Sequence, residues 1–429
     1  MLAHHNSSRR RLPLILDYFH LDPIISKKDV NGLILALLHR NCVRRIRLRM
    51  PVQTLRRLIN AIDKDFPMLE YLYIEPLNMQ DTRLSLPESL QAQGLRHLVL
   101  VNFAFPIGSP LLKDLVTLSL ENIHLYIYFN ANELLQRLSL MPQLETFRIS
   151  SHSPLSNRNV ERQLLKTPLS TDVKLPKLRW FGFGGASAYM NAVLPRITMP
   201  LLKVIEIMFF NQPSDSMLFI LRFLCKTENP RFGDIRVTFC RQDVVVMMYA
   251  QGQTGMYAIR MRIICEDLDM QVASVVQIFN GVRLVFTEAE SLILEHETSF
   301  KGHTESPGRA PWRELLRPFH NVKVLHVTSN LTEELSRSLR PDYGESPIEL
   351  LPELELLSYS ASSYNAATGE SFGPFIHVRQ NVGFPVILVP SAEIPKPLFG
   401  DTVVMICDVP QSGTQQRVTI EYMVGDFDT

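Results

Sequence analysis

A few short stretches contain residue types found in phosphate-binding and cation-binding sites. Gly182-Phe183-Gly184-Gly185 lies between a predicted strand and a predicted helix, where phosphate-binding turns occur. A dinucleotide-binding fingerprint requires a third glycine at the position of Ser187, so we favour a strand of small residues that leaves the sheet. Cys265-Glu266-Asp267-Leu268-Asp269 offers carboxylates without the spacing of a calcium-binding loop, and we interpret it as a solvated turn that caps the next helix.

The histidines and the common catalytic motifs give no indication of an enzyme. No two of the neighbouring histidines have the spacing of metal ligands on one helix face; they are His296, His303, His320 and His326. A nucleophile elbow, a phosphate-binding loop and a paired-carboxylate signature are all missing from the sequence. We therefore expect no enzymatic activity, no cofactor and no metal site.

Arginine and aromatic residues at alternating positions form the strongest candidate for a binding site. Arg45, Arg47 and Arg49 are spaced by two residues and therefore leave the same face of a strand. On the predicted neighbouring strands, the same face carries Tyr71, Tyr73, His97, Arg148 and Trp180. Three guanidinium groups this close repel one another, and an acidic segment of a protein partner would relieve that repulsion. The alternative is that Glu75 and solvent neutralise the arginines and that nothing binds there.

These residues lie in copies of a pattern that recurs along the chain, Pro-x-apolar-Glu/Arg-x-apolar-x-apolar. Copies with the proline span 67–74, 142–149, 176–183, 200–207 and 352–359, and copies without it begin at Val43, Leu95, Leu115, Ala289 and Val322. The last residues of each copy alternate between apolar and polar, which predicts a half-buried strand. Most of the spacings are near those of leucine-rich repeats. Residues 29–39, 54–63 and 132–140 carry apolar stripes at helical spacing and predict helices between the copies.

Strands of this kind must stack to bury their apolar edges, so we predict an α/β fold, a leucine-rich-repeat-like solenoid, over residues 12–389. It would form a horseshoe with a parallel sheet on the concave side and helices or loops on the convex side. The strands should lie side by side in chain order, including those that contain Leu72, Leu98, Leu118, Phe147, Phe181 and Ile205. A β-rich stretch near 235–265 predicts a hairpin inserted into, or replacing part of, two repeats.

The two ends of the chain differ from the repeats. Residues 1–11 are polar and basic, and we expect them to be disordered. Residues 390–429 form a C-terminal extension, in which Thr402–Val409 and Arg417–Val424 alternate like the strands of a β-hairpin.

Composition narrows the classes of partner and the compartment. The formal net charge is +1, from 44 lysines and arginines against 43 acidic residues, which gives no indication of nucleic-acid or membrane binding. The five cysteines are scattered and include no close pair, which is typical of reduced thiols. No apolar run approaches membrane-spanning length. We therefore expect a cytoplasmic or nuclear protein without a nucleic-acid or membrane partner.

Several stretches together carry a family resemblance: 66–72, 95–98, 102–108, 134–145, 175–183, 312–316 and 351–354. Over about residues 12 to 389 the chain resembles the repeat region of a fungal family of F-box, leucine-rich-repeat-like proteins. In that family a helical F-box precedes the repeats and docks on the adaptor of a ubiquitin ligase, and the repeats hold the substrate. Only residues 1–11 precede the first predicted strand here, so this sequence lacks the F-box.

The resemblance implies a non-enzymatic protein-binding module that holds a protein partner on its concave face. A ligase adaptor would be a second partner only if an upstream F-box is missing from this chain. The alternative is a free-standing inhibitor or scaffold that is unrelated to ubiquitin transfer.

Overall fold

The computed structural model describes residues 12–19, 25–77, 84–103, 105, 111, 113–123, 129–151, 171–185, 187–210, 232–251, 257–281, 286, 288–297, 308–341, 344–359 and 370–390. In these residues the chain is a mixed α/β protein with one large, open sheet of 15 strands. The predicted N-terminal segment 1–11 lies outside the described residues, as does the C-terminal extension from 391 onward, with its predicted hairpin.

The N-terminal half of the sheet is parallel and follows chain order. Its strands are β1 (Leu14–Phe19), β2 (Val43–Pro51), β3 (Tyr71–Leu77), β4 (His97–Val101), β5 (Thr117–Ile123), β6 (Thr146–Ser151), β8 (Trp180–Gly185) and β10 (Val204–Phe210). One row of register partners runs straight across them, through Ile46, Leu72, Leu98, Leu118, Phe147, Phe181 and Ile205. The predicted side-by-side order of these strands is therefore confirmed.

The centre of the sheet departs from chain order. The predicted β-rich stretch supplies three strands, β11 (Phe232–Phe239), β12 (Asp243–Ala250) and β13 (Tyr257–Ile264). The last of them, β13, lies beside β10, and β11 lies beside the next strand, β14 (Ser291–His296). Between them β12 is antiparallel to both. The expected insertion is thus a three-stranded meander that is part of the main sheet.

The C-terminal end of the sheet is again parallel and in chain order. It consists of β14, β15 (Val324–Val327), β16 (Leu356–Tyr359) and β17 (Ile387–Pro390). A separate two-stranded sheet joins β7 (Val173–Lys174) to β9 (Ile197–Thr198).

Helices connect many of the strands. They are α1 (Lys27–Leu38), α2 (Val52–Ile62), α3 (Ala131–Ser139), α5 (Ser187–Val193), α7 (Leu268–Gly281), α8 (Arg309–Leu316), α9 (Thr332–Leu339) and α10 (Gly373–Asn381). Short 3-10 helices are η1 (Arg40–Cys42), η4 (Leu194–Arg196), η6 (Ser329–Leu331) and η8 (Glu370–Phe372). The three helices predicted from apolar stripes correspond to α1, α2 and α3. In α3, Asn130 and Glu133 form a reciprocal capping box that satisfies the first-turn backbone N–H groups.

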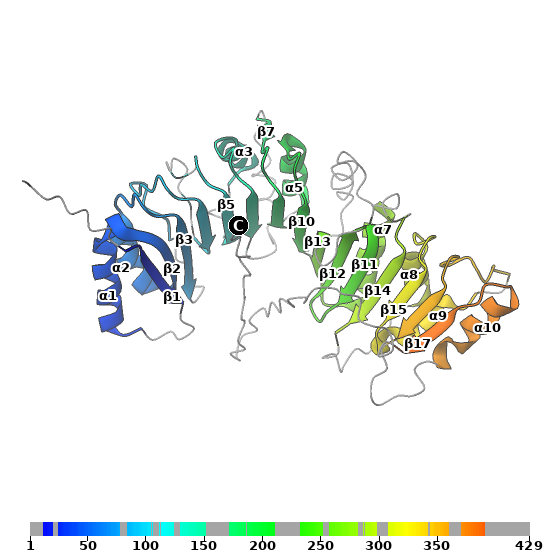
Figure 1. The fold of residues 1–429 in the computed structure, drawn as a ribbon. Coiled ribbons are helices and arrows are strands. Elements are labelled where there is room, and N and C mark those ends of the chain that lie inside the picture. The colour runs from blue at the N-terminus through cyan, green and yellow to red at the C-terminus, as the bar shows by residue number, and fades with distance from the viewer. Residues whose placement is uncertain are drawn as a thin grey trace, which may run out of the picture.

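The sheet is curved, and the core lies on one side of it. Figure 1 shows α1, α3 and α5 on the outer side of the curve. The row from Ile46 to Ile205 is almost completely buried on this side, in one continuous hydrophobic core. Because side chains alternate along a strand, the residues between the buried ones lie on the inner side, which we call the concave face.

Candidate functional site

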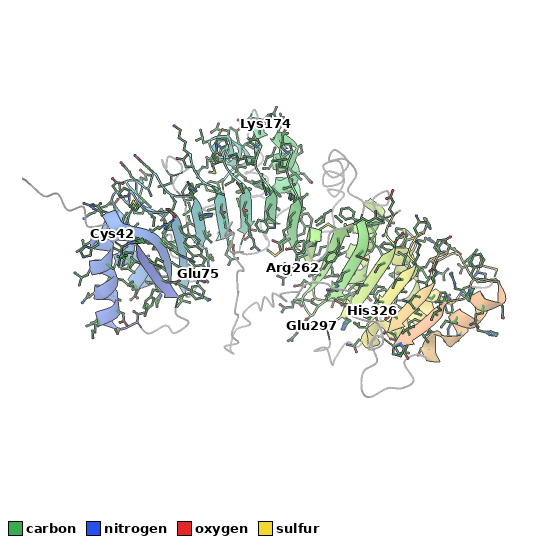
Figure 2. All side chains as sticks on the ribbon, in the orientation of Figure 1. Cys42, Glu75, Lys174, Arg262, Glu297 and His326 are labelled. Carbon is green, nitrogen blue, oxygen red and sulfur yellow. The ribbon has the colours of Figure 1, made fainter. Side chains whose placement is uncertain are left out.

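The first three strands bring the predicted arginines and tyrosines together on the concave face. Arg45 is in register with Tyr71, Arg47 with Tyr73, and Arg49 with Glu75. The edge strand β1 adds Asp17 opposite Arg47, and Phe19 opposite Arg49. We call this group the arginine patch: Asp17, Phe19, Arg45, Arg47, Arg49, Tyr71, Tyr73 and Glu75. Figure 2 shows Glu75 on the inner side of the curved sheet, and Lys174 on its outer side.

Aromatic rings hold the guanidinium groups of the patch in place. The Arg45 guanidinium lies 4.5 Å from the centre of the Tyr71 ring. That of Arg47 lies 4.0 Å from the centre of Phe19 and 5.6 Å from that of Tyr73. Such contacts favour a cation over the ring face and restrict the side chain to one position. The arginines are therefore preorganised by rings from the neighbouring strands.

Two carboxylates compensate part of the positive charge. Arg49 Nε lies 3.2 Å from Glu75 Oε1, and the Tyr73 hydroxyl donates a hydrogen bond to Glu75 Oε2. Arg47 Nη1 lies 3.8 Å from Asp17 Oδ2, beyond hydrogen-bond distance. Glu75 thus supplies the neutralisation of Arg49 that the alternative interpretation expected. Arg45 makes no ion pair with any residue that the structure describes.

Burial shifts the ionisation of several groups at this end of the concave face. It raises the pKa of the Glu75 carboxyl, and the hydrogen bond from Tyr73 and the charge of Arg49 oppose that shift. It raises the pKa of Tyr71 and lowers that of His97, because burial disfavours the charged form of each group. His97 Nδ1 lies 3.1 Å from Thr117 Oγ1, and its ring centre lies 6.2 Å from that of Tyr71. His97 therefore extends the aromatic surface of the patch onto β4.

Arg148 and Trp180 lie on the same face but away from the patch. Arg148 is on β6, separated from β2 by β3, β4 and β5, or roughly 19 Å at the usual spacing of strands. Its guanidinium lies 5.7 Å from the Trp180 ring centre and 3.6 Å from the Glu121 carboxylate. These two predicted residues thus form a separate group at the centre of the sheet.

The glycine-rich stretch lies within β8 and does not form a phosphate-binding turn. Gly182 and Gly184 are in register with Arg148 and Ser150 of β6. A Cβ atom at Gly182 would lie 3.0 Å from Arg148 Cγ, and one at Gly184 would lie 2.8 Å from Ser150 Cβ. The glycines therefore leave space that neighbouring side chains fill.

The central strands carry a second series of charged residues that was not predicted from the sequence. Arg260 Nη1 donates a 2.8 Å hydrogen bond to Glu206, and Arg262 pairs with Asp243. Farther along, Arg236 Nε lies 3.9 Å from Glu295. Arg260-Met261-Arg262 has the same alternation as the arginines of β2, and that signal was available in the sequence. Figure 2 shows Arg262 on the inner side of the curve.

The fold and this face define a mixed α/β sheet protein with a charged and aromatic concave face. No known protein-family model matches the chain, and no curated protein matches it in sequence. No helix in the part of the chain that the structure describes is long and apolar enough to cross a membrane. The same residues contain no group of three histidines, cysteines or acidic residues arranged to hold a metal ion.

Proposed function

We propose that the chain is a leucine-rich-repeat-like solenoid, a horseshoe whose concave face binds another protein without catalysing a reaction. In this proposal the arginine patch holds an acidic segment of the partner, as the resemblance to F-box substrate receptors implies for the repeats. The proposal concerns this face alone and does not depend on a role in ubiquitin transfer.

Repetition of backbone detail supports the solenoid. The same backbone hydrogen bond recurs at the entry to successive strands, from the N–H groups of Glu70, Arg96, Val116, Glu145, Arg179 and Lys203 to the carbonyl of the preceding copy. Asn102 and Asn122, at the ends of β4 and β5, both have φ of 52°, a conformation that asparagine tolerates better than most residues. Equivalent positions therefore repeat their conformation as well as their residue types.

The binding proposal rests on the charge balance of the patch and on the contacts that hold its arginines. Three arginines against two carboxylates leave the patch with one positive charge in excess, and Arg45 and Arg47 are oriented by rings rather than by close acidic partners. A guanidinium whose N–H groups are not already used in hydrogen bonds can bind a carboxylate through two parallel hydrogen bonds. The tyrosines beside them supply rigid contact area that loses little entropy on binding.

The test compares binding of a fluorescent oligoglutamate peptide with that of the matched oligoglutamine, measured by fluorescence anisotropy. Wild type should bind oligoglutamate more tightly, and Arg45→Glu/Arg47→Glu should weaken that binding by about tenfold or more. Arg49 is left unchanged because its replacement would strand the Glu75 carboxylate. Partner recovery from cell extract should fall in the same variant.

The matched control is Arg56→Glu/Arg57→Glu on α2, which changes the charge equally at the same end of the molecule. Both arginines are exposed on the helix, away from the concave face. This control should bind oligoglutamate nearly as well as wild type. Equal losses in the two variants, or no preference of wild type for oligoglutamate, would contradict the proposal.

A further inference from the structure

The two carboxylates of the arginine patch are held in very different ways. Glu75 has a side chain that is only 16% exposed, accepts a hydrogen bond from Tyr73 and lies 3.2 Å from Arg49. Asp17 has a side chain that is 43% exposed and lies 3.8 Å from its arginine. The Glu75 carboxylate is therefore held firmly by neighbouring side chains, whereas the Asp17 carboxylate is held only weakly.

Arg47 does not need Asp17 to keep its position. Its guanidinium lies against the Phe19 and Tyr73 rings, and it donates no hydrogen bond to any residue in the described part of the chain. The side chain of Arg47 is 27% exposed, so part of it can be reached from the concave face. Arg47 is thus oriented for a hydrogen-bonded anion that none of the described residues provides.

The backbone sets the position of Asp17. Its residue is fixed in register opposite Arg47 by the pairing of β1 with β2. In this position its carboxylate lies 3.8 Å from Arg47, and its short side chain limits the orientations it can adopt. A carboxylate on a separate molecule has no such restraint and can form two short hydrogen bonds with the guanidinium.

We propose that Asp17 stands where a carboxylate of the acidic ligand binds at Arg47, and that it is an internal competitor which the ligand displaces. This inference rests on the proposed function and specifies its anchor, a glutamate or aspartate of the partner on Arg47. Asp17 thereby sets the affinity of the patch and favours ligands whose carboxylate can displace it.

The test is the effect of Asp17→Asn on binding of the oligoglutamate peptide, followed by anisotropy, with thermal unfolding as a check of the fold. Removing the competitor should tighten binding about two- to fivefold, the range expected for an exposed ion pair. Asp17→Thr, which suits an edge strand, should give the same direction of change. In an Arg47→Gln background Asp17→Asn should have no effect.

Glu70→Gln is the matched control. Glu70 is partly exposed immediately before β3 and lies 2.7 Å from Arg44. Its replacement also removes one negative charge and releases one arginine. If Glu70→Gln tightens oligoglutamate binding as much as Asp17→Asn does, only the net charge of the protein matters. That result would overturn the inference. Weaker binding or no change in Asp17→Asn would also overturn it, with the proposed function intact. If neither wild type nor Asp17→Asn prefers oligoglutamate to oligoglutamine, the proposed function itself fails.

Discussion

Arginine side chains on the concave face combine two kinds of contact, with rings and with carboxylates. Rings contribute most at β1–β3, where Phe19 and the tyrosines contact the guanidinium groups. Carboxylates contribute most at the central strands, where Arg260 and Arg262 each have a close acidic partner. A paired arginine must give up its partner to bind a ligand, which costs free energy. The N-terminal end and the centre of the face therefore differ in readiness to bind an anion.

The pH dependence of stability tests the environment of Glu75. Because its pKa is raised in the folded state above the ordinary value of 4.5, the folded protein binds more protons than the unfolded chain just above that pH. The free energy of unfolding therefore falls as pH rises from 4.5 through the raised pKa. Glu75→Gln lacks this titration. We expect urea unfolding to show wild type losing stability relative to Glu75→Gln across this window.

The comparison between these two proteins removes the contribution of the other titrating groups. A difference in the free energy of unfolding that stays constant across the window would show that the carboxyl is not affected by burial. A difference that grows in favour of wild type as pH rises would show that the charges of Arg49 and Arg47 outweigh burial.

Period-two alternation explains which site residues could be predicted from the sequence. Arg45, Arg47 and Arg49 must share a face in any regular strand, and the structure places Tyr71 and Tyr73 beside them. Asp17 and Phe19 were not predicted as site residues, because their position beside the arginines depends on the register between β1 and β2. No local pattern specifies that register. The acidic partners of the central arginines depend on strand register in the same way, whereas the alternation of Arg260 and Arg262 was visible in the sequence.

Glycines in β8 show how one element adapts to its neighbours. A Cβ at Gly184 would come within 2.8 Å of Ser150 Cβ and 2.9 Å of Met208 Cε, from the strands on either side. The Ser150 Cβ belongs to a strand backbone that cannot easily move. The strand thus depends on glycine at this position.

Substitution of this glycine gives a stability prediction at the scale of the element. Gly184→Ala should lower the free energy of unfolding by about 1–3 kcal/mol, because overpacking forces a shift of β6 or β10. Gly32→Ala in α1 is the opposite case, since a Cβ there meets nothing within 4 Å. It should raise stability by up to about 1 kcal/mol through helix propensity. Denaturant unfolding of both variants measures the sign of each change in stability. A Gly184→Ala variant that is as stable as wild type, or more stable, would contradict the close packing at β8.

At the scale of the whole molecule, the repeat pattern predicted strand order well only where the pattern itself continued. Copies whose first apolar residues are Leu69, Leu95 and Leu115 specify similar strands, and neighbours in sequence became neighbours in the sheet. Between 202 and 289 no copy of the pattern was found. The position of β13 beside β10 depends on pairing between distant strands, which alternation alone cannot specify.

The N-terminal end of the molecule presents two surfaces to solvent, the concave face of the sheet and the outer side of the helices. Ile15 on β1 is in register with Arg45 and therefore lies on the concave face, with 59% of its surface exposed. Leu35 on α1 is similarly exposed, at 62%, and belongs to a helix on the outer side of the curve (Figure 1). The two residues provide matched positions for a reporter group.

Site-specific photo-cross-linking from these two positions tests most directly whether the concave face is the binding face. A benzophenone amino acid replaces Ile15 in one variant and Leu35 in the other, and each is irradiated with labelled oligoglutamate or oligoglutamine. The account predicts cross-links to oligoglutamate from position 15, suppressed by added salt, and little cross-linking from position 35. Cross-links that form from position 35 and not from position 15 would contradict it.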